Sequence, residues 1–172
     1  MNNTKKLTLS ALFLALGFVL PFLTGQLPQI GRMMLPMHIP VLVCGFVCGA
    51  PYGLLVGFIV PLLRSLLLGK PELMPTAVAM AIELATYGFV TGLLYVKLKS
   101  KKLGILITLI LSMLAGRIVW GLVSLLLYQL LGNTFTWELF MAGAFLNAIP
   151  GIIIQLIFIP VIIYSLRKAD LM

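Results

Sequence analysis

The chain has 172 residues, of which 62% are hydrophobic and only 9% are charged, and its mean hydropathy is +1.18. Soluble domains are about 45–50% apolar and about 25% charged, so this composition excludes a soluble globule and a disordered chain. It leaves an integral membrane protein. The formal net charge of +8 indicates a nucleic-acid-binding protein only if the basic residues gather on one binding face.

Six apolar segments follow one another along the chain, and they predict an all-α membrane protein. They cover residues 7–23, 38–49, 51–68, 75–96, 103–131 and 137–166. We expect six transmembrane helices in one compact bundle, with residues 1–172 forming a single domain. The runs are continuous rather than alternating, which argues against a membrane β-barrel.

The lengths of the segments differ, and this predicts irregular features. A membrane-spanning helix needs about 20 apolar residues, so the second segment is too short to cross the hydrocarbon core. The fifth and sixth segments are long enough to tilt or kink. We expect a kink at Pro150-Gly151 in the sixth segment, because proline removes a backbone donor.

A stretch rich in proline and glycine, TGQLPQIGRMMLPM, separates the first two segments and contains Gln29. Irregular backbone at membrane depth is tolerated only against protein or a wet cavity. The region around residues 24–40 is therefore predicted to be the wall or lid of a site.

The basic residues predict the orientation in the membrane. Eight of the twelve fall before the first segment, between the fourth and fifth, or after the sixth: Lys5, Lys6, Lys97, Lys99, Lys101, Lys102, Arg167 and Lys168. With six crossings, these places lie on one side, and the positive-inside rule puts both termini in the cytoplasm. The positive charge is thus a signal of topology in a lipid bilayer, and no nucleic acid partner is expected.

Four polar residues lie inside apolar segments: Arg64, Glu83, Arg117 and Asn147. Such groups are costly in lipid and usually face a bundle interior or a cavity. The helical rise places all four in the outer half of the membrane or near its midplane. Two interpretations remain open, an ion pair that only holds the bundle together and a set of ligand contacts.

Helical spacing puts polar and small side chains on one face of each of the last three segments. The stripes are Thr76, Met80, Glu83 and Tyr87; Arg117, Trp120, Ser124 and Tyr128; and Gly143, Asn147, Gly151 and Gln155. Three such faces with aromatic rings among the polar groups suit a small polar ligand. The candidate ligand-binding residues are Glu83, Tyr87, Arg117, Trp120 and Asn147. His38 is a further candidate that either lines the site or caps the short second helix.

Small residues and cysteines in the second and third segments indicate packing rather than chemistry. Glycines recur every four residues at Gly45, Gly49, Gly53 and Gly57, which favours close helix contact. Cys44 and Cys48 lie one turn apart without further ligand residues, so they are expected to be buried thiols and not a metal site.

The sequence contains no recognisable catalytic constellation. A single His and a single Asp argue against acid–base or metal chemistry as the basis of function, and no nucleotide-binding motif of the Walker A type is present. We expect no enzyme activity, no cofactor and no metal. If the protein drives active transport, the energy must come from an ion gradient or from a partner.

Three local features resemble the substrate-binding S components of energy-coupling factor (ECF) vitamin transporters. Ala11-Leu-Phe-Leu-Ala15 is similar to the AxxxA motif of that family. The runs LPMHIPVLVCGFVCGAPYGLLVGFIVPLLRSLL and PTAVAMAIELATYGFVTGLLY resemble its second to fourth helices. The resemblance extends over essentially the whole chain.

The resemblance implies a mechanism and a set of partners. An S component captures a scarce vitamin or precursor from outside, docks onto a membrane coupling subunit that carries two cytoplasmic ATPases, and releases the substrate inward. The protein is then a multi-pass protein of a prokaryotic plasma membrane. Ala11 and Ala15 are the implied contacts with the coupling subunit. Ligand groups are implied on helices four to six, beneath the loop that contains Gln29; Arg64, on helix three, is a less expected contact.

The substrate and the function class each keep alternatives. The candidate residues fit hydroxymethylpyrimidine or a pyridoxine-type vitamer best, while pantothenate would use an arginine for its carboxylate. A small secondary transporter with Glu83 as the proton carrier is the first alternative in function. A membrane scaffold subunit without a substrate is the second.

Overall fold

The computed structural model describes residues 2–24, 33–101 and 103–169, and every regular element in these ranges is helical. The elements are α1 (Asn3–Val19), η1 (Leu20–Thr24), α3 (His38–Cys48), α4 (Ala50–Leu68), η2 (Leu73–Ala77), α5 (Val78–Leu98), α6 (Gly104–Leu130), α7 (Trp137–Ala144), η3 (Leu146–Ala148) and α8 (Ile149–Lys168). This confirms the prediction of an all-α membrane fold.

Within the described ranges, five helical segments are long and apolar enough to cross a membrane. They contain α1, α4, α5, α6 and α8. The remaining apolar helix, α3, has 11 residues and rises only about 16 Å, against about 30 Å of hydrocarbon. A sixth crossing at α3 stays a prediction.

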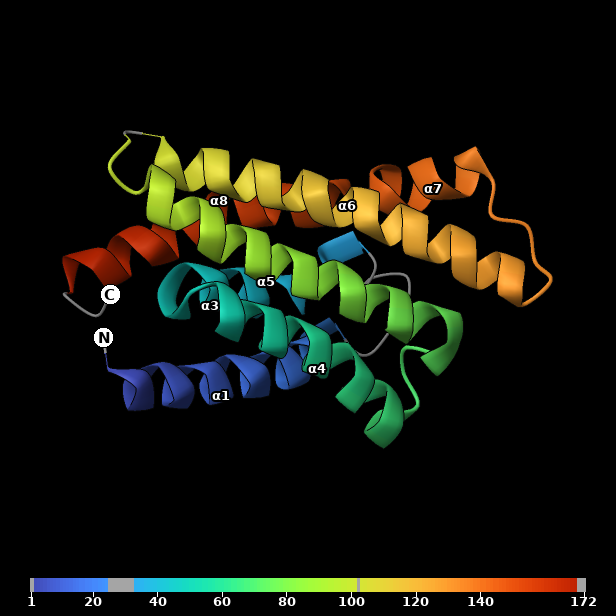
Figure 1. Ribbon diagram of the computed structural model, residues 1–172, viewed down its shortest axis with the longest axis horizontal. Coiled ribbons are helices and arrows are strands. Elements are labelled where there is room, and N and C mark those ends of the chain that lie inside the picture. Colours follow the sequence, from blue (N-terminus) through green and yellow to red (C-terminus); the bar gives the residue numbers. More distant parts are fainter. Residues whose placement is uncertain (1, 25–32, 102, 170–172) are drawn as a thin grey trace.

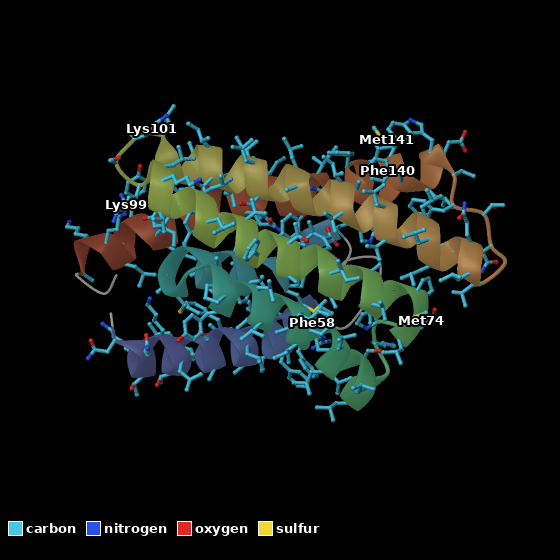
Figure 2. All side chains as sticks on the ribbon, in the orientation of Figure 1. Phe58, Met74, Lys99, Lys101, Phe140 and Met141 are labelled. Atoms are coloured by element: carbon cyan, nitrogen blue, oxygen red, sulfur yellow. The ribbon has the colours of Figure 1, made fainter. Side chains whose placement is uncertain are left out.

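The long helices run side by side, and the turns between them gather at the two ends of the bundle (Figure 1). The start of α1, the end of α8 and the α5–α6 turn share one end, while the connections from α4 to α5 and from α6 to α7 share the other. Figure 2 shows Lys99 and Lys101 at the first end and Phe140 and Met141 at the opposite end. The first end is the one that the positive-inside rule assigns to the cytoplasm.

Helix α3 forms the centre of the bundle. Nine of its 11 residues are buried, and it packs against α1, α4, α5 and α8. Its apolar composition all round is typical of a helix enclosed by other helices. The two thiols on α3, Cys44 and Cys48, are free and buried, and Cys44 lies 3.8 Å from the hydroxyl of Ser10 on α1.

Glycines allow α3, α4 and α5 to approach backbone to backbone. A Cβ atom on Gly88 of α5 would lie 2.2 Å from the carbonyl oxygen of Gly53, and one on Gly57 would lie 2.3 Å from that of Leu84. A Cβ on Gly45 would lie 2.6 Å from the carbonyl oxygen of Gly88. The packing role predicted for Gly45, Gly53 and Gly57 is thus confirmed, since small residues let membrane helices touch closely.

Gly49 is required by a turn and not by a contact at its own Cβ position. This residue lies between α3 and α4 with a φ of 93°, and no atom lies within 4 Å of the position of its missing Cβ. Gly49 therefore makes the turn between the two helices, because a positive φ is strained for residues with a side chain.

The sixth apolar segment is not one helix kinked at Pro150. Helix α7 ends at Ala144, Phe145 leaves the helical conformation with φ −126° and ψ −63°, and a short η3 turn precedes α8. Pro150 lies in the first turn of α8, where its missing N–H group has no helical partner to lose. The break falls before the proline. Residues of α7 and α8 that are spaced as on one continuous helix therefore do not share a face.

Candidate functional site

Glu83 lies at the centre of a buried polar cluster. It projects from the second turn of α5 and is 2% exposed. Nη1 of Arg117 lies 2.9 Å from its Oε1 atom, and the hydroxyl of Tyr87 donates to the same oxygen at 3.2 Å. Nε2 of His38 lies 3.7 Å from that oxygen. Three different helices therefore supply groups to one carboxylate oxygen.

His38 reaches this cluster because α3 is short and starts inside the bundle. It is the first residue of α3 and 2% exposed, and its ring centroid lies 5.3 Å from that of Tyr87. A full-length helix at this place would begin nearer the surface. The short second segment thus places its N-terminal side chain at the depth of Glu83.

Tyr87 and Arg117 are brought together by Gly116. A Cβ on Gly116 of α6 would lie 2.6 Å from a ring carbon of Tyr87, so the ring of Tyr87 rests on the glycine backbone. The next residue along α6 is Arg117, which is 5% exposed. The i, i+4 spacing of Glu83 and Tyr87 puts both on one face of α5, towards this point of α6.

The cluster contains more donors than it satisfies. Among the described residues, Nε and Nη2 of Arg117 and both ring nitrogens of His38 have no hydrogen-bond partner, although all four atoms are buried. No described side chain meets Oε2 of Glu83, because all three partners lie at Oε1. A buried donor without a partner costs about 1–3 kcal/mol and more when it is charged. The open groups of Arg117 are therefore a place where a ligand gains binding energy.

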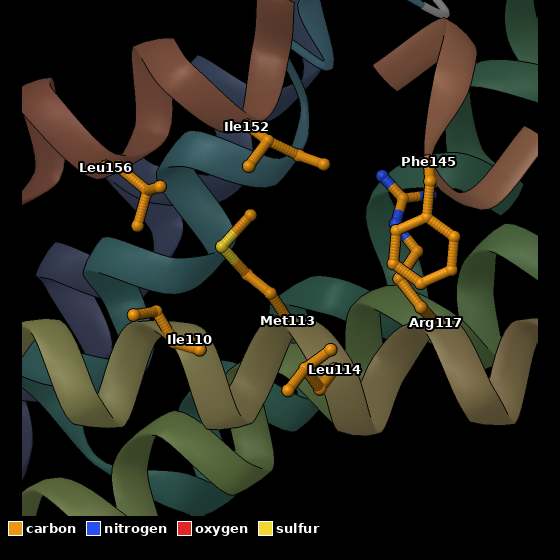
Figure 3. Close-up of a pocket in the computed structure, with 7 residues that line it drawn as sticks. All are labelled: Ile110, Met113, Leu114, Arg117, Phe145, Ile152 and Leu156. Carbon is orange, nitrogen blue, oxygen red and sulfur yellow. The ribbon is translucent and has the colours of Figure 1, made fainter. Parts of the chain in front are cut away.

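A cavity of about 210 Å³ adjoins this cluster between α6 and α8. Its walls are Ile110, Met113 and Leu114 of α6, Phe145 at the break, and Ile152 and Leu156 of α8, with Arg117 as its charged residue. Figure 3 shows the guanidinium group of Arg117 beside Phe145 at one end and Leu156 at the other. Sites for drug-sized ligands hold roughly 300–1,000 Å³, so this cavity suits a smaller molecule.

The structure brings four of the predicted ligand residues together and separates the others. His38, Glu83, Tyr87 and Arg117 form the cluster described above. Trp120 lies instead against α7, where its ring stacks on Phe140 at 6.2 Å between centroids, and a Cβ on Gly143 would lie 2.6 Å from its ring.

Asn147 lies outside the cluster. It is in the η3 turn and exposed, whereas the predicted stripe placed it on the same face as Gln155. That prediction assumed one continuous helix, and the break at Phe145 rotates Asn147 away. Gln155, 1% exposed, does face the interior.

Arg64 also lies elsewhere. Its side chain donates to the carbonyl oxygen of Phe18 at the end of α1, and its guanidinium carbon lies 5.5 Å and 5.2 Å from the ring centroids of Phe18 and Phe22. It thus joins α4 to the α1–η1 junction through a hydrogen bond and two cation–π contacts. Gln29 is outside the described residues.

Two residues near the site were not among the sequence candidates. Phe145 lines the cavity, and nothing in the sequence marks it, since its position depends on the break between α7 and η3. Gln155 lies on the predicted polar stripe of the last segment, so its polar character in an apolar run was a usable signal. Its Nε2 atom is buried without a hydrogen-bond partner among the described residues.

No group of three or more His, Cys, Asp or Glu side chains within the described ranges has the arrangement of a metal site. The polar cluster combines one carboxylate, one guanidinium, one imidazole and one phenol. It is suited to hydrogen bonding with a small molecule, beside an apolar cavity that accepts the body of that molecule.

Comparison with known protein families identifies the family of this chain. The family model described as ECF transporter, substrate-specific component, matches residues 5–163. The chain belongs to this family. Comparisons with curated proteins and with solved structures gave no match. The predicted identity as an S component is confirmed.

Membership of the ECF family also establishes the general role of the chain. S components are membrane-embedded substrate-binding subunits of transporters and are not enzymes, and partner ATPases hydrolyse the ATP. The family implies association with a coupling subunit of the EcfT type, with EcfA-type ATPases and with a small-molecule substrate. The protein is accordingly a multi-pass membrane protein.

Proposed function

We propose that this S component captures a small water-soluble vitamin or vitamin precursor at the Glu83–Arg117 cluster, from the outer side of a prokaryotic plasma membrane. The observation that carries the proposal is the buried guanidinium of Arg117, whose Nε and Nη2 groups find no partner among the described residues and which lies beside a cavity. Hydroxymethylpyrimidine or a pyridoxine-type vitamer fits this site best, and pantothenate is the next candidate.

A purely structural ion pair accounts less well for these features. An ion pair that only stabilises a bundle is expected to satisfy its remaining hydrogen-bonding groups, because the low dielectric makes open ones costly. Among the described residues, Arg117 and His38 hold four of the eight buried side-chain nitrogen and oxygen atoms that have no hydrogen-bond partner. Arg117 also lines the cavity between α6 and α8.

The experiment is equilibrium binding to the purified subunit, after native mass spectrometry has identified the co-purified ligand. Loss of a charge-assisted hydrogen bond costs about 1.5–3 kcal/mol, so we expect Glu83→Gln and Arg117→Met each to weaken binding roughly 10- to 150-fold. Arg64→Met is the matched control, because it removes a buried arginine that contacts α1 instead.

The double variant Glu83→Gln with Arg117→Gln guards against a failure to fold. A single substitution leaves one buried charge uncompensated, which by itself is strongly destabilising, whereas the double variant leaves none. Normal binding by all three variants would place the ligand elsewhere. A double variant that folds but cannot bind supports the proposal, and one that fails to fold supports the structural interpretation.

We further propose that the coupling subunit contacts the α1 face that carries Ala11 and Ala15. Both residues are exposed, while Ser10, Phe13 and Gly17 face the bundle. Small side chains on a free helix face let another membrane helix approach closely. Helix α1, which carries both residues, starts at the same end of the bundle as the lysine-containing α5–α6 turn.

Ala11→Trp and Ala15→Trp are therefore expected to abolish uptake and complex assembly while the affinity of the isolated subunit stays unchanged. Leu12→Trp is the control, because it replaces an exposed side chain that is already large. Uptake is measured in cells that contain the coupling subunit and the ATPases. Full uptake by the alanine variants would contradict this contact, and uptake without the ATPases would support the secondary-transporter alternative.

A further inference from the structure

The hydrogen-bonding groups left open on the Glu83–Arg117 pair indicate which ligand chemistry the site accepts. Oε1 of Glu83 accepts from Arg117 and Tyr87, and no hydrogen bond from the described residues reaches Oε2, so we take Oε2 as the open acceptor. On Arg117, Nη1 is used, and the Nε and Nη2 groups have no hydrogen-bond partner among the described residues. These two donors belong to one rigid planar fork, so an acceptor and a donor edge lie next to each other on the paired side chains.

The charge of the site argues against an anionic ligand. Glu83 and Arg117 neutralise each other at 2.9 Å. Arg64 is engaged at the end of α1. Lys99 and Lys101 of the α5–α6 turn lie at the end of the bundle away from Phe140 and Met141. A carboxylate bound here would be a third buried charge, compensated only if His38 were protonated, and an uncompensated buried charge is strongly unfavourable.

The cavity adds a constraint on shape. Apart from Arg117, all six residues of its wall are apolar. A ligand with polar groups around its whole edge would lose hydrogen bonds on entering, since a buried polar group without a partner is costly. A ligand with one polar edge and an apolar remainder loses none.

We infer that the substrate is an uncharged, planar heteroaromatic molecule that presents a hydrogen-bond donor next to an acceptor on one edge. The donor binds Oε2 of Glu83, the acceptor binds the free edge of Arg117, and the rest of the ring enters the apolar cavity between α6 and α8. This inference rests on the proposed function, and it selects the uncharged heteroaromatic candidates over pantothenate.

The first test uses ligands that differ in charge at nearly constant shape. Nicotinamide offers an amide donor and acceptor on one edge, and nicotinate carries a carboxylate at the same place. Hydroxymethylpyrimidine and pantothenate form the second, vitamin-sized comparison. With the purified wild-type subunit, isothermal titration is expected to show at least tenfold tighter binding of the neutral member of each comparison.

The second test replaces the carboxylate of Glu83, which only accepts hydrogen bonds, by an amide, which can donate them. Glu83→Gln makes the site net positive and removes the carboxylate, so binding of hydroxymethylpyrimidine should fall at least tenfold and binding of pantothenate should rise. Glu138→Gln is the control, because it makes the same substitution at an exposed position on α7. Circular dichroism and gel filtration check that the Glu83→Gln protein is folded.

The outcomes separate this inference from the proposed function. Tighter wild-type binding of the anionic members, or no binding of either neutral ring, would overturn the inference. So would stronger binding of hydroxymethylpyrimidine to Glu83→Gln. If Arg117→Gln and Glu83→Gln leave every measured affinity unchanged, the proposed site itself is wrong. If Glu83→Gln does not fold, the comparison of nicotinamide with nicotinate on the wild-type protein decides whether the site prefers an uncharged ligand.

Discussion

The two sides of α5 are packed in different ways. Towards α3 and α4 the contacts are made by backbone atoms at glycines, and a single added carbon would lie within 2.2–2.6 Å of a carbonyl oxygen. Towards α6 the contacts include long side chains, among them the buried Glu83–Arg117 ion pair, and a cavity of about 210 Å³ lies beyond them between α6 and α8. Glycine contact gives a rigid, dry interface, whereas side-chain contact leaves room for another molecule.

This difference assigns separate roles to the two sides. The α3–α4–α5 side fixes the position of Glu83 and His38, because both residues lie on helices that cannot shift without backbone clashes. The α6–α8 side supplies Arg117 and the apolar wall on helices that touch each other only sparsely. We expect substitutions on the first side to affect folding and substitutions on the second to affect binding.

The largest expected effect comes from adding one methyl group to the tight side. Gly88→Ala places a Cβ 2.2 Å from the carbonyl oxygen of Gly53, and backbone cannot move aside as a side chain can. Overpacking usually costs about 1–3 kcal/mol, and we expect at least about 3 kcal/mol here, measured as loss of folded protein on urea or thermal denaturation.

A matched substitution at a side-chain contact, between α7 and α6, sharpens the comparison. Gly143→Ala adds the same methyl group, but it meets only the ring of Trp120, a side chain that can rotate. We expect a destabilisation below about 1.5 kcal/mol. Equal destabilisation by Gly88→Ala and Gly143→Ala would remove the distinction between backbone contact and side-chain contact.

An intermediate effect is expected from filling the cavity. Ile152→Trp adds a large ring to the α8 wall, so ligand affinity should fall about tenfold or more, an energy of about 1.4 kcal/mol, while stability changes little. Ile157→Trp is the control, because Ile157 is 58% exposed on the same helix. Unchanged affinity of Ile152→Trp in a titration would show that the ligand does not enter between α6 and α8.

The smallest effect is expected at Tyr87. Tyr87→Phe removes the 3.2 Å hydrogen bond to Glu83 and keeps the ring that rests on Gly116. A hydrogen bond to a charged group contributes about 1.5–3 kcal/mol, but this one is long for an O–H···O bond, so we expect a smaller effect, roughly a fivefold loss of affinity, and no loss of folded protein. A loss larger than that of Arg117→Met would mean that Tyr87, and not Arg117, is the main polar contact.

Much of the membrane fold was predictable from the sequence. Apolar runs of about 20 residues predict helices wherever they occur, because backbone groups in lipid must bond within their own segment. The glycines at spacing four predicted close helix contact for α3 and α4, although not that α5 is the partner. The depths of Glu83 and Arg117 along their segments predicted that these opposite charges could meet.

The site was predictable only where regular helical geometry continued. Trp120 was assigned from helical spacing, and Asn147 from helical spacing and depth. Spacing gives the face of a helix but not the neighbour of that face. Trp120 turned to α7, and Asn147 became exposed because the helix breaks at Phe145. Arg64 was matched by depth to Glu83, yet it contacts the end of α1.

The sequence by itself determined that this chain is a helical membrane protein with a costly carboxylate and guanidinium in its interior. Hydrophobic length and charge distribution are local properties, so they can be read directly from the chain. Only the tertiary structure decided that α3 starts at the depth of Glu83, that Gly116 receives the ring of Tyr87, and that a cavity opens beside Arg117. These features depend on how separate helices pack against each other. The residue spacing within one helix does not determine which side chains of a distant helix will fit against it.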